Sequence, residues 1–491
     1  MAIELSPSTT LGRIAMSSTP DEDLSGFRLL PLGFYSLDAR LQLARRAEVS
    51  LDIQYYVFEN DETGRLMLRA MRDAARRGVR VRLLLDDLYT GASESLLLAF
   101  AAHENVEVRL FNPFCCARSQ GPAARFLASA SDWSRVNHRM HNKLFVADGA
   151  MAVIGGRNIA NEYFLRSSGE NFVDLDAFTI GFVVSPLQFL FDRYWNSKAV
   201  FPLLALAHSD ASPQVLRALF DEWTGPASTP SAPALPANDV LGYGPLSDEL
   251  ELGRLGLIWG EARVFADHPD KPFDDVPGGE LAETSVAYNL FEMIRTANEE
   301  VVISSPYFVP GPLSLAMLRD LRARNVRVVV LTNSLASTDE PAVHVGYGRY
   351  RETLLKMGVE LSELSSSRLK SNQQHHRFGK SLGRLHAKLV VIDKRHVFIG
   401  SMNLDPRSAT VNTELGALIE SPQLARELRR VIDIDRLQSA YRLRLKSDGS
   451  CCEWLKPDDD TEAIVVEEPD STLWQRLRAR LFAPFVPEEQ L

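Results

Sequence analysis

The chain repeats one pattern of hydrophobic and polar positions. An apolar run, LDIQYY at 51–56, is followed by a stretch with helical periodicity and then by VRVRLLLDD at 79–87. The same order returns with VVISSPYF at 301–308 and VRVVVLTN at 326–333. Short runs rich in β-branched residues suit buried strands. Each half therefore predicts a strand, a helix and a second strand.

The helix of the first half is predicted from the spacing of its apolar residues. It should end at Gly78, which follows two arginines and provides a stop signal. Strands that alternate with helices indicate α/β layers, with helices on both faces of a central sheet. The predicted buried face of this helix consists of Leu66, Ala70, Met71 and Ala74.

A second repeat is more specific than the hydrophobic pattern. HNKLFVADGAMAVIGGRN begins at His141, and HAKLVVIDKRHVFIGSMN begins at His386. Five identities without a gap arise by chance about once in a few million registers, so the repeat indicates duplication. The identical pairs, each offset by 245 residues, are His141/His386, Lys143/Lys388, Asp148/Asp393, Gly155/Gly400 and Asn158/Asn403.

The proline-rich stretch GPASTPSAPALPAND at 225–239 separates the two copies. Four prolines among small polar residues do not build a core, so this stretch is predicted to be a linker or loop. A chain of 491 residues is also long for one domain. We predict a first domain over 1–224 and a second over 240–491, the latter with an amphipathic C-terminal tail.

The repeated residues suit phosphoryl chemistry. Residues i and i+2 of a strand point to the same face, so the histidine and lysine of each motif should project together. If the halves pack about a pseudo-twofold axis, one imidazole can attack phosphorus and the other can transfer protons. Lysine and asparagine donors would hold the phosphoryl oxygens. No metal and no other cofactor is expected, because these cationic side chains supply the charge stabilisation.

The motif H-x-K-x4-D followed by G-[GS]-x-N, present twice, resembles the phospholipase D superfamily. Three stretches, 51–64, 139–164 and 400–416, are closest to the C-type bacterial cardiolipin synthases. The resemblance implies an α/β fold of two similar α/β/α sandwich domains with the active site at their interface. It also implies transfer of a phosphatidyl group onto phosphatidylglycerol, from phosphatidylethanolamine or a second phosphatidylglycerol, through a phosphohistidine.

The resemblance also assigns roles to individual residues. His141 matches the usual nucleophile, because it is the N-terminal copy, and His386 matches the general acid and base. The two motif aspartates belong to the catalytic motif, but their place at a turn between strands favours a structural role, bonding backbone amides. The matched phosphate- and substrate-binding positions are Lys143, Lys388, Asn158, Asn403 and Ser401, and the two motif aspartates are Asp148 and Asp393.

A later carboxylate in each half is implied to hydrogen-bond an imidazole Nδ1. Asp174 fits that position in the first half, with Asp176 as its rival, and Glu414 fits it in the second. Three further sets of residues keep two interpretations each. Arg157 and Arg407 either bind a second phosphate or form ordinary ion pairs, His344 either lines the acceptor side or is structural, and His375 and His376 either belong to a mobile basic loop or guard the pocket.

Charge and composition narrow the range of partners. The net charge of -10 and the pI near 5.6 count against a nucleic-acid partner. No run reaches 18 consecutive apolar residues, and the start of the chain does not read as a signal peptide. We therefore expect a cytoplasmic enzyme, peripherally bound to the inner membrane, whose partners are phospholipids. The tail STLWQRLRARLF is predicted to be either an interfacial helix on an anionic membrane or a helix packed on its own domain.

Other functions remain as alternatives. A phospholipase D hydrolase with water as acceptor would use the same histidines and lysines. A phosphodiesterase or nuclease would share the chemistry, but the acidic charge counts against it. A non-catalytic lipid-binding scaffold is disfavoured, because both motifs are complete.

Overall fold

Strands from both halves form one continuous sheet. The computed structural model describes residues 4–114, 122–129, 132–232, 234–271, 285–367, 382–447, 449, 452–456 and 463–482. The first half contributes β1 (Ser25–Leu30), β2 (Ser50–Tyr55), β3 (Arg80–Asp86), β4 (Val106–Phe111), β5 (Leu144–Ala147), β6 (Met151–Gly155), β8 (Asp176–Gly181) and β9 (Val200–Pro202). The second contributes β10 (Ile258–Ala266), β11 (Glu300–Ser304), β12 (Arg327–Asn333), β13 (Glu360–Leu364), β15 (Leu389–Ile392), β16 (His396–Gly400), β17 (Leu415–Glu420), β18 (Ala440–Leu445), β19 (Cys452–Lys456) and β20 (Ala463–Val465).

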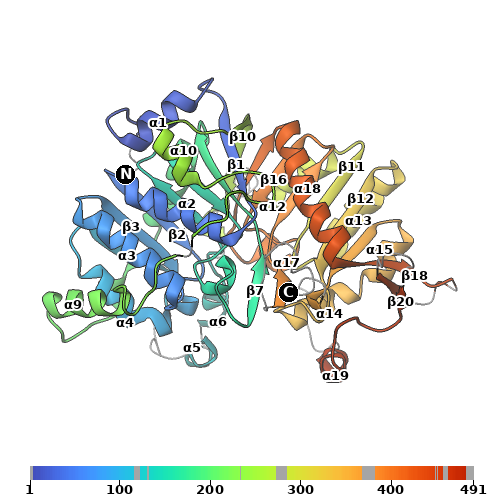
Figure 1. Ribbon diagram of the computed structural model, residues 1–491. Coiled ribbons are helices and arrows are strands. Elements are labelled where there is room, and N and C mark those ends of the chain that lie inside the picture. Colours follow the sequence, from blue (N-terminus) through green and yellow to red (C-terminus); the bar gives the residue numbers. More distant parts are fainter. Residues whose placement is uncertain are drawn as a thin grey trace.

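The strand order has the symmetry expected of a duplicated fold. Pairing gives β9-β4-β3-β2-β5-β6-β8-β1 in the first half and β10-β17-β16-β15-β11-β12-β13-β18-β19-β20 in the second. Antiparallel pairing of β1 with β10 joins the two. Read outward from this junction, corresponding strands of the two halves occur in the same order, so the pseudo-twofold axis passes between β1 and β10 (Figure 1).

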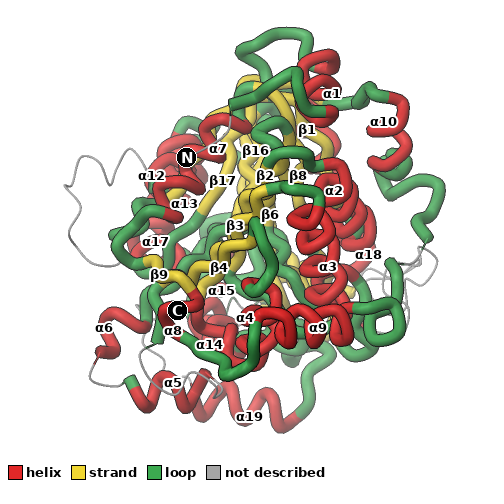
Figure 2. The backbone as a smooth tube through the Cα atoms, turned by 90° about the vertical axis from the view of Figure 1, so that its left-hand side faces the viewer, coloured by secondary structure: helices red, strands yellow, loops and turns green. Residues whose placement is uncertain are grey.

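Helices cover both faces of each half, as predicted. In the first half α2 and α3 pack on one face and α7 on the other, and an apolar core continues through the junction to α18 (Figures 1 and 2). The helices of the first half are α1 (Thr10–Ser18), α2 (Gly33–Arg46), α3 (Glu62–Arg76), α4 (Glu94–Ala101), α5 (Pro122–Ala128), α6 (Trp133–Val136), α7 (Val184–Trp195), α8 (Leu203–Leu206), α9 (Pro213–Thr224) and the 3-10 turns η1 (Asp87–Ser93) and η3 (Asn161–Phe164). They are followed by α10 (Leu246–Leu252), α12 (Val286–Arg295), α13 (Gly311–Ala323), α14 (Pro341–Gly348), α15 (Arg351–Lys356), α17 (Pro406–Thr410), α18 (Pro422–Ser439) and α19 (Leu473–Phe482).

Helix α3 shows how the local sequence sets these elements. Its N-cap Asp61 accepts a hydrogen bond from the backbone N–H of Gly64, which satisfies one free donor of the first turn. Gly78 follows the helix with φ +95°, a conformation that glycine adopts without strain. The predicted apolar face is confirmed: Leu66, Ala70, Met71 and Ala74 are all buried.

The chain returns to the first half after the proline-rich stretch. The described residues of 225–239 contain neither helix nor strand, yet Thr229 is fully buried among them. Helix α10 then packs on α2, and its Leu246 and Leu250 join the core of the first half. The domain boundaries given above remain a prediction.

A small parallel sheet bridges the two halves. It pairs β7 (Glu170–Val173) of the first half with β14 (Leu382–Leu385) of the second, and these strands lead directly to Asp174 and His386. Among the described residues, no helix combines the length and the apolar character needed to cross a bilayer.

Candidate active site

Each motif histidine lies in a segment that binds the opposite half of the molecule. The backbone N–H of His141 donates to the carbonyl of Thr413 at 2.8 Å, and that of His386 donates to the carbonyl of Val173 at 2.7 Å. The prediction that these histidines lie on strands is wrong by a few residues, because β5 begins at Leu144 and β15 at Leu389. Before each of these strands begins, the backbone at the histidine hydrogen-bonds to the opposite half instead of to its own sheet.

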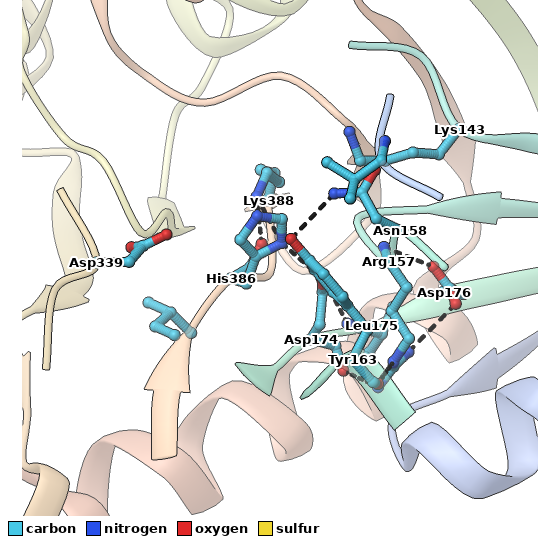
Figure 3. A network of polar contacts seen from close by, with 12 residues as sticks. Lys143, Arg157, Asn158, Tyr163, Asp174, Leu175, Asp176, Asp339, His386 and Lys388 are labelled. Carbon is cyan, nitrogen blue, oxygen red and sulfur yellow. Dashed lines mark hydrogen bonds and ion pairs between the residues drawn. The ribbon is translucent and has the colours of Figure 1, made fainter. Parts of the chain in front are cut away.

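The orienting carboxylates are exchanged between the halves. Glu414 of the second half accepts from Nδ1 of His141, at 2.9 and 3.1 Å to its two oxygens. Asp174 of the first half accepts from Nδ1 of His386 at 2.7 Å (Figure 3). A carboxylate on Nδ1 fixes the tautomer and leaves Nε2 for chemistry. Neither half therefore holds a complete histidine–carboxylate pair.

Both imidazoles line one cavity of about 1170 Å³ between the halves. The two residues are 7% and 5% exposed, so their rings are largely shielded from water. Tyr56 packs edge-on against His141, and Tyr163 against His386, each with ring centroids 5.0 Å apart. Sequence reasoning missed these two tyrosines, whose only signal is their position after β2 and after the first motif.

The lysines lie directly behind the histidines. Lys143 Nζ donates to the carbonyl of His141 at 2.7 Å, and Lys388 Nζ donates to that of His386 at 2.5 Å and lies 3.1 Å from its Nε2. Both lysines are almost fully buried. Two basic groups therefore lie behind the imidazoles that line the cavity.

The two asparagines line the same cavity as the imidazoles. Asn158 accepts from the N–H of Val57 at 3.1 Å and donates to the hydroxyl of Tyr163 at 3.0 Å. Asn403 is 5% exposed, and its Oδ1 has no hydrogen-bond partner in the described part of the structure. An unpaired buried amide costs free energy unless a ligand contacts it, so the environment of Asn403 suits a bound polar group.

Burial and mutual repulsion shift the pKa values of the four basic groups downward. Desolvation, then the charges of Lys143 and Lys388, hold the pKa of His141 well below its usual 6.5. Desolvation and Lys388 also lower the pKa of His386, although Asp174 opposes that shift. Burial lowers the pKa of Lys143 to about 7 and that of Lys388 to about 8. His141 is therefore neutral at pH 7, as a nucleophile must be.

The two carboxylates differ in charge state. Burial acts to raise the pKa of Asp174, but the charge and hydrogen bond of His386, with Lys388 and Arg157, lower it to about 2. Burial raises the pKa of Glu414 to about 7, against the charges of Lys143 and the hydrogen bond of Ser401. An ionised Asp174 favours a protonated His386, so His386 is better placed than His141 to act as an acid.

The two carboxylates have different neighbours at the corresponding motif position. Gly156 lies beside Asp174, and Ser401 lies beside Glu414. Ser401 donates from its hydroxyl to Glu414 and accepts from the N–H of Leu415 at 2.9 Å. A Cβ on Gly156 would lie 2.3 Å from Oδ1 of Asp174, so no side chain fits there. Ser401 is fully buried, and its hydroxyl contacts Glu414. The expectation that Ser401 contacts the substrate is therefore corrected.

We expect Gly156→Ser to be far more damaging than its mirror change Ser401→Gly. The new side chain displaces the Asp174 carboxylate, which costs about 1–3 kcal/mol of unfolding free energy and lowers kcat. Ser401→Gly removes one hydrogen bond, worth about 1 kcal/mol. Urea unfolding and turnover of both variants check this. Equal effects of the two changes would contradict the packing argument.

The motif aspartates lie away from the cavity, which corrects their place in the catalytic set. The Asp148 carboxylate accepts from the backbone N–H groups of Glu48, Val49 and Ser50 at 2.8–3.1 Å. Asp393 accepts in the same way from residues 298–300 at 2.8–3.2 Å. Each fixes the loop before a central strand, which agrees with the structural interpretation of the turn.

The remaining candidates are also placed by their contacts. Arg157 is buried and donates to the carbonyls of Leu30 and Pro31 at 2.8 Å, so it is structural, as is its partner Asp176. Arg407 lines the cavity and binds Asn137. His344 lies buried in α14 beside Arg351, rather than in an exposed loop on the acceptor side. His375 and His376 lie outside the described residues.

Acidic side chains line the same cavity as the two imidazoles. Asp339 faces His386 across the cavity (Figure 3), and its Oδ2 accepts from the hydroxyl of Tyr307 at 2.7 Å. Burial raises the pKa of Asp405 to about 6. Acidic side chains at the cavity wall disfavour the entry of a polyanion. The acidic lining residues are Glu59, Glu162, Glu170, Asp339, Glu340 and Asp405.

We expect kcat/KM to be highest on the acid side of neutrality and to fall as the pH rises through neutrality. His386, the general acid, loses its proton at a pKa lowered below its usual 6.5, and Lys143 and Lys388 lose theirs near pH 7 and 8. Lys143→Arg stays charged and should make the fall above pH 7 less steep. A profile that rises steadily to pH 9 would contradict this distribution of charge.

Comparisons with known proteins agree with this geometry. The family described as "Cardiolipin synthase, PLD-like domain" matches residues 41–195 and 290–436. "Cardiolipin synthase C" of Escherichia coli is 39% identical over 93% of this chain and 94% of its own length, and a "Cardiolipin synthase" of Staphylococcus aureus is 25% identical over 89% and 72%. The crystal structure of phosphatidylserine synthase from Haemophilus influenzae superposes with a TM-score of 0.60 at 15% identity, covering 98% of this chain and all of that one.

Proposed function

This chain belongs to the phospholipase D-like family of cardiolipin synthases, and we propose that it transfers a phosphatidyl group onto phosphatidylglycerol to make cardiolipin. The observation that carries the proposal is the pair of imidazoles in one cavity, each held at Nδ1 by a carboxylate of the other half. The carboxylates thereby leave the Nε2 side of each imidazole for one phosphorus centre, with Lys388 Nζ 3.1 Å from Nε2 of His386.

In the first step Nε2 of His141 attacks the phosphorus of the donor lipid. An N–P bond forms, the P–O bond to the donor's headgroup alcohol breaks, and His386 gives its Nε2 proton to the departing oxygen. Lys143 and Lys388 stabilise the charge on the phosphoryl oxygens. The assignment of His141 as nucleophile rests on its neutral state and on the ionised Asp174 beside His386.

In the second step a glycerol hydroxyl of phosphatidylglycerol replaces the departed alcohol. The neutral His386 takes the hydroxyl proton, the oxygen attacks phosphorus, and the N–P bond to His141 breaks with its electron pair returning to nitrogen. Both histidines then have their starting protonation states. Phosphatidylethanolamine as donor releases ethanolamine, and a second phosphatidylglycerol releases glycerol.

Two rivals share the histidines and lysines. In a hydrolase, water enters in place of the glycerol hydroxyl, so the balance depends on how well the second alcohol is held. A nuclease would have to draw a polyanion past the acidic side chains of the cavity, which costs electrostatic free energy. The acidic lining therefore favours a lipid substrate with one phosphate near the reacting bond.

The substrates also define where the enzyme works. Phosphatidylglycerol and phosphatidylethanolamine reside in bilayers, so the cavity has to reach a membrane surface. We propose peripheral association with the cytoplasmic side of the inner membrane.

The products of the pure protein test the proposal. It is incubated with labelled phosphatidylglycerol in detergent micelles, with and without phosphatidylethanolamine, and the lipids are read by mass. Cardiolipin supports the transferase. Phosphatidic acid alone would assign the chain to the hydrolases, and cleavage of an oligonucleotide without any lipid product would assign it to the nucleases.

A further inference from the structure

Helix α19 turns its apolar side chains away from the protein. Leu473, Trp474, Leu477 and Leu481 are 78%, 69%, 48% and 61% exposed. At about 100° per residue these four positions fall within an arc of about 100° on one side of the helix. A helix packed on its own domain directs such an arc inward. This arc is therefore available to another surface.

Arginines border the apolar arc. The helical period places Arg478 just beyond one edge of the arc and Arg480 just beyond the other, and both are exposed. Arg476, next to Arg480, pairs with Glu467. Apolar side chains with a tryptophan, flanked by cations, are typical of helices that lie in the headgroup region of anionic bilayers.

The helix is held firmly by the segment before it. Glu468 forms ion pairs with Arg351, and Asp470 accepts from the hydroxyls of Ser367 at 2.8 Å and Tyr441 at 3.2 Å. The ion pair of Glu468 with Arg351 also offsets one acidic charge that would otherwise oppose an anionic surface. The outward direction of the apolar arc is therefore set by the fold.

The position of α19 connects it to the catalytic cavity. It packs on α14, whose Ala342 and Val343 line the cavity. Figures 1 and 2 both place α19 at the lower end of the molecule, together with α5, whose Leu127 is 79% exposed. A surface bound to α19 would lie next to the cavity.

We propose that α19 is the membrane-docking helix, which inserts its apolar arc among the headgroups of an anionic phospholipid bilayer and holds the cavity against the lipid surface. The charge complementarity is local, because the chain as a whole carries a net charge of -10. The inference rests on the proposed function for the lipids that then enter the cavity. Docking itself needs no turnover.

Flotation of the full chain with vesicles tests the helix. On vesicles of phosphatidylglycerol and phosphatidylcholine, Trp474→Glu with Leu477→Glu should weaken binding at least about tenfold, since two inserted side chains are lost. The matched control is Leu252→Glu, which also replaces an 82% exposed leucine but lies on α10, far from α19 in both views. It should bind as the unchanged chain does.

Charge reversal and activity separate docking from catalysis. Arg478→Glu with Arg480→Glu should reduce binding to the anionic vesicles and leave the weak binding to pure phosphatidylcholine vesicles unchanged. In detergent micelles the Trp474→Glu, Leu477→Glu variant should keep the kcat of the unchanged chain, because no residue of α19 is among those that line the cavity. If the unchanged chain forms no product in micelles, the proposed function is refuted. Flotation would still measure docking in that case, because it needs no turnover.

Two results would overturn the docking proposal. One is vesicle binding of the Trp474→Glu, Leu477→Glu variant within twofold of the control. The other is a dimer of the unchanged chain in sedimentation that becomes monomeric in this variant, which would assign the apolar arc to a second copy.

Discussion

Replacement of His141 by alanine is expected to lower kcat by about 10⁴-fold or more. The change removes the nitrogen that attacks phosphorus, and loss of a nucleophile costs this much in enzymes that use covalent intermediates. The fold should persist, because the ring makes one side-chain hydrogen bond, to Glu414, at the edge of the cavity. Product formation in lipid micelles measures the effect.

Two controls accompany this variant. Thermal unfolding and vesicle flotation should match those of the unchanged chain, so that inactivity is not attributed to misfolding or to lost docking. Activity within tenfold of the unchanged chain would end the two-histidine mechanism.

Asp174→Asn is expected to lower kcat by about 10³-fold although the new side chain has the same size. The asparagine no longer supplies the negative charge that supports a protonated His386, and its amide can also favour the wrong imidazole tautomer. The loss of this carboxylate should lower the pKa of His386 further, so the alkaline limb of the kcat profile should move to lower pH. A purely structural role would not move that limb.

Asp176→Asn provides a matched control two residues away. Asp176 is equally buried, but it pairs with Arg40 and Arg157 and accepts from Ser36. Its loss should reduce the unfolding free energy by about 3–5 kcal/mol, as for a broken buried pair. The kcat of the folded fraction should stay within a few fold. If instead Asp176→Asn costs more turnover than Asp174→Asn, the roles of the two aspartates are reversed.

The sequence was sufficient to predict the duplicated α/β architecture and the two histidines that line the cavity. Five identities at one offset indicated two equivalent halves, and the choice of His141 and His386 followed from that repeat. The buried strands and the apolar face of α3 follow directly from side-chain periodicity. These features are local, so a local pattern can predict them.

The contacts between the halves could not be predicted in this way. Glu414 and Asp174 were found by their place in each copy, but nothing local assigns Glu414 to His141 or Asp174 to His386. The pairing of β1 with β10 and the aromatic wall formed by Tyr56 likewise depend on packing between distant segments. A duplicated sequence predicts the fold of each half, but it does not predict which residues of the two halves contact each other.

In the proposed mechanism His141 attacks the same phosphorus centre that His386 serves as acid and base. The direct test uses His386→Ala with a phosphodiester whose leaving group is p-nitrophenol, which departs without a proton. We expect a burst of one equivalent of p-nitrophenolate and, after an alkaline quench, a phosphoryl adduct on His141 detected by mass spectrometry. No burst, or an adduct on any other residue, would contradict the account.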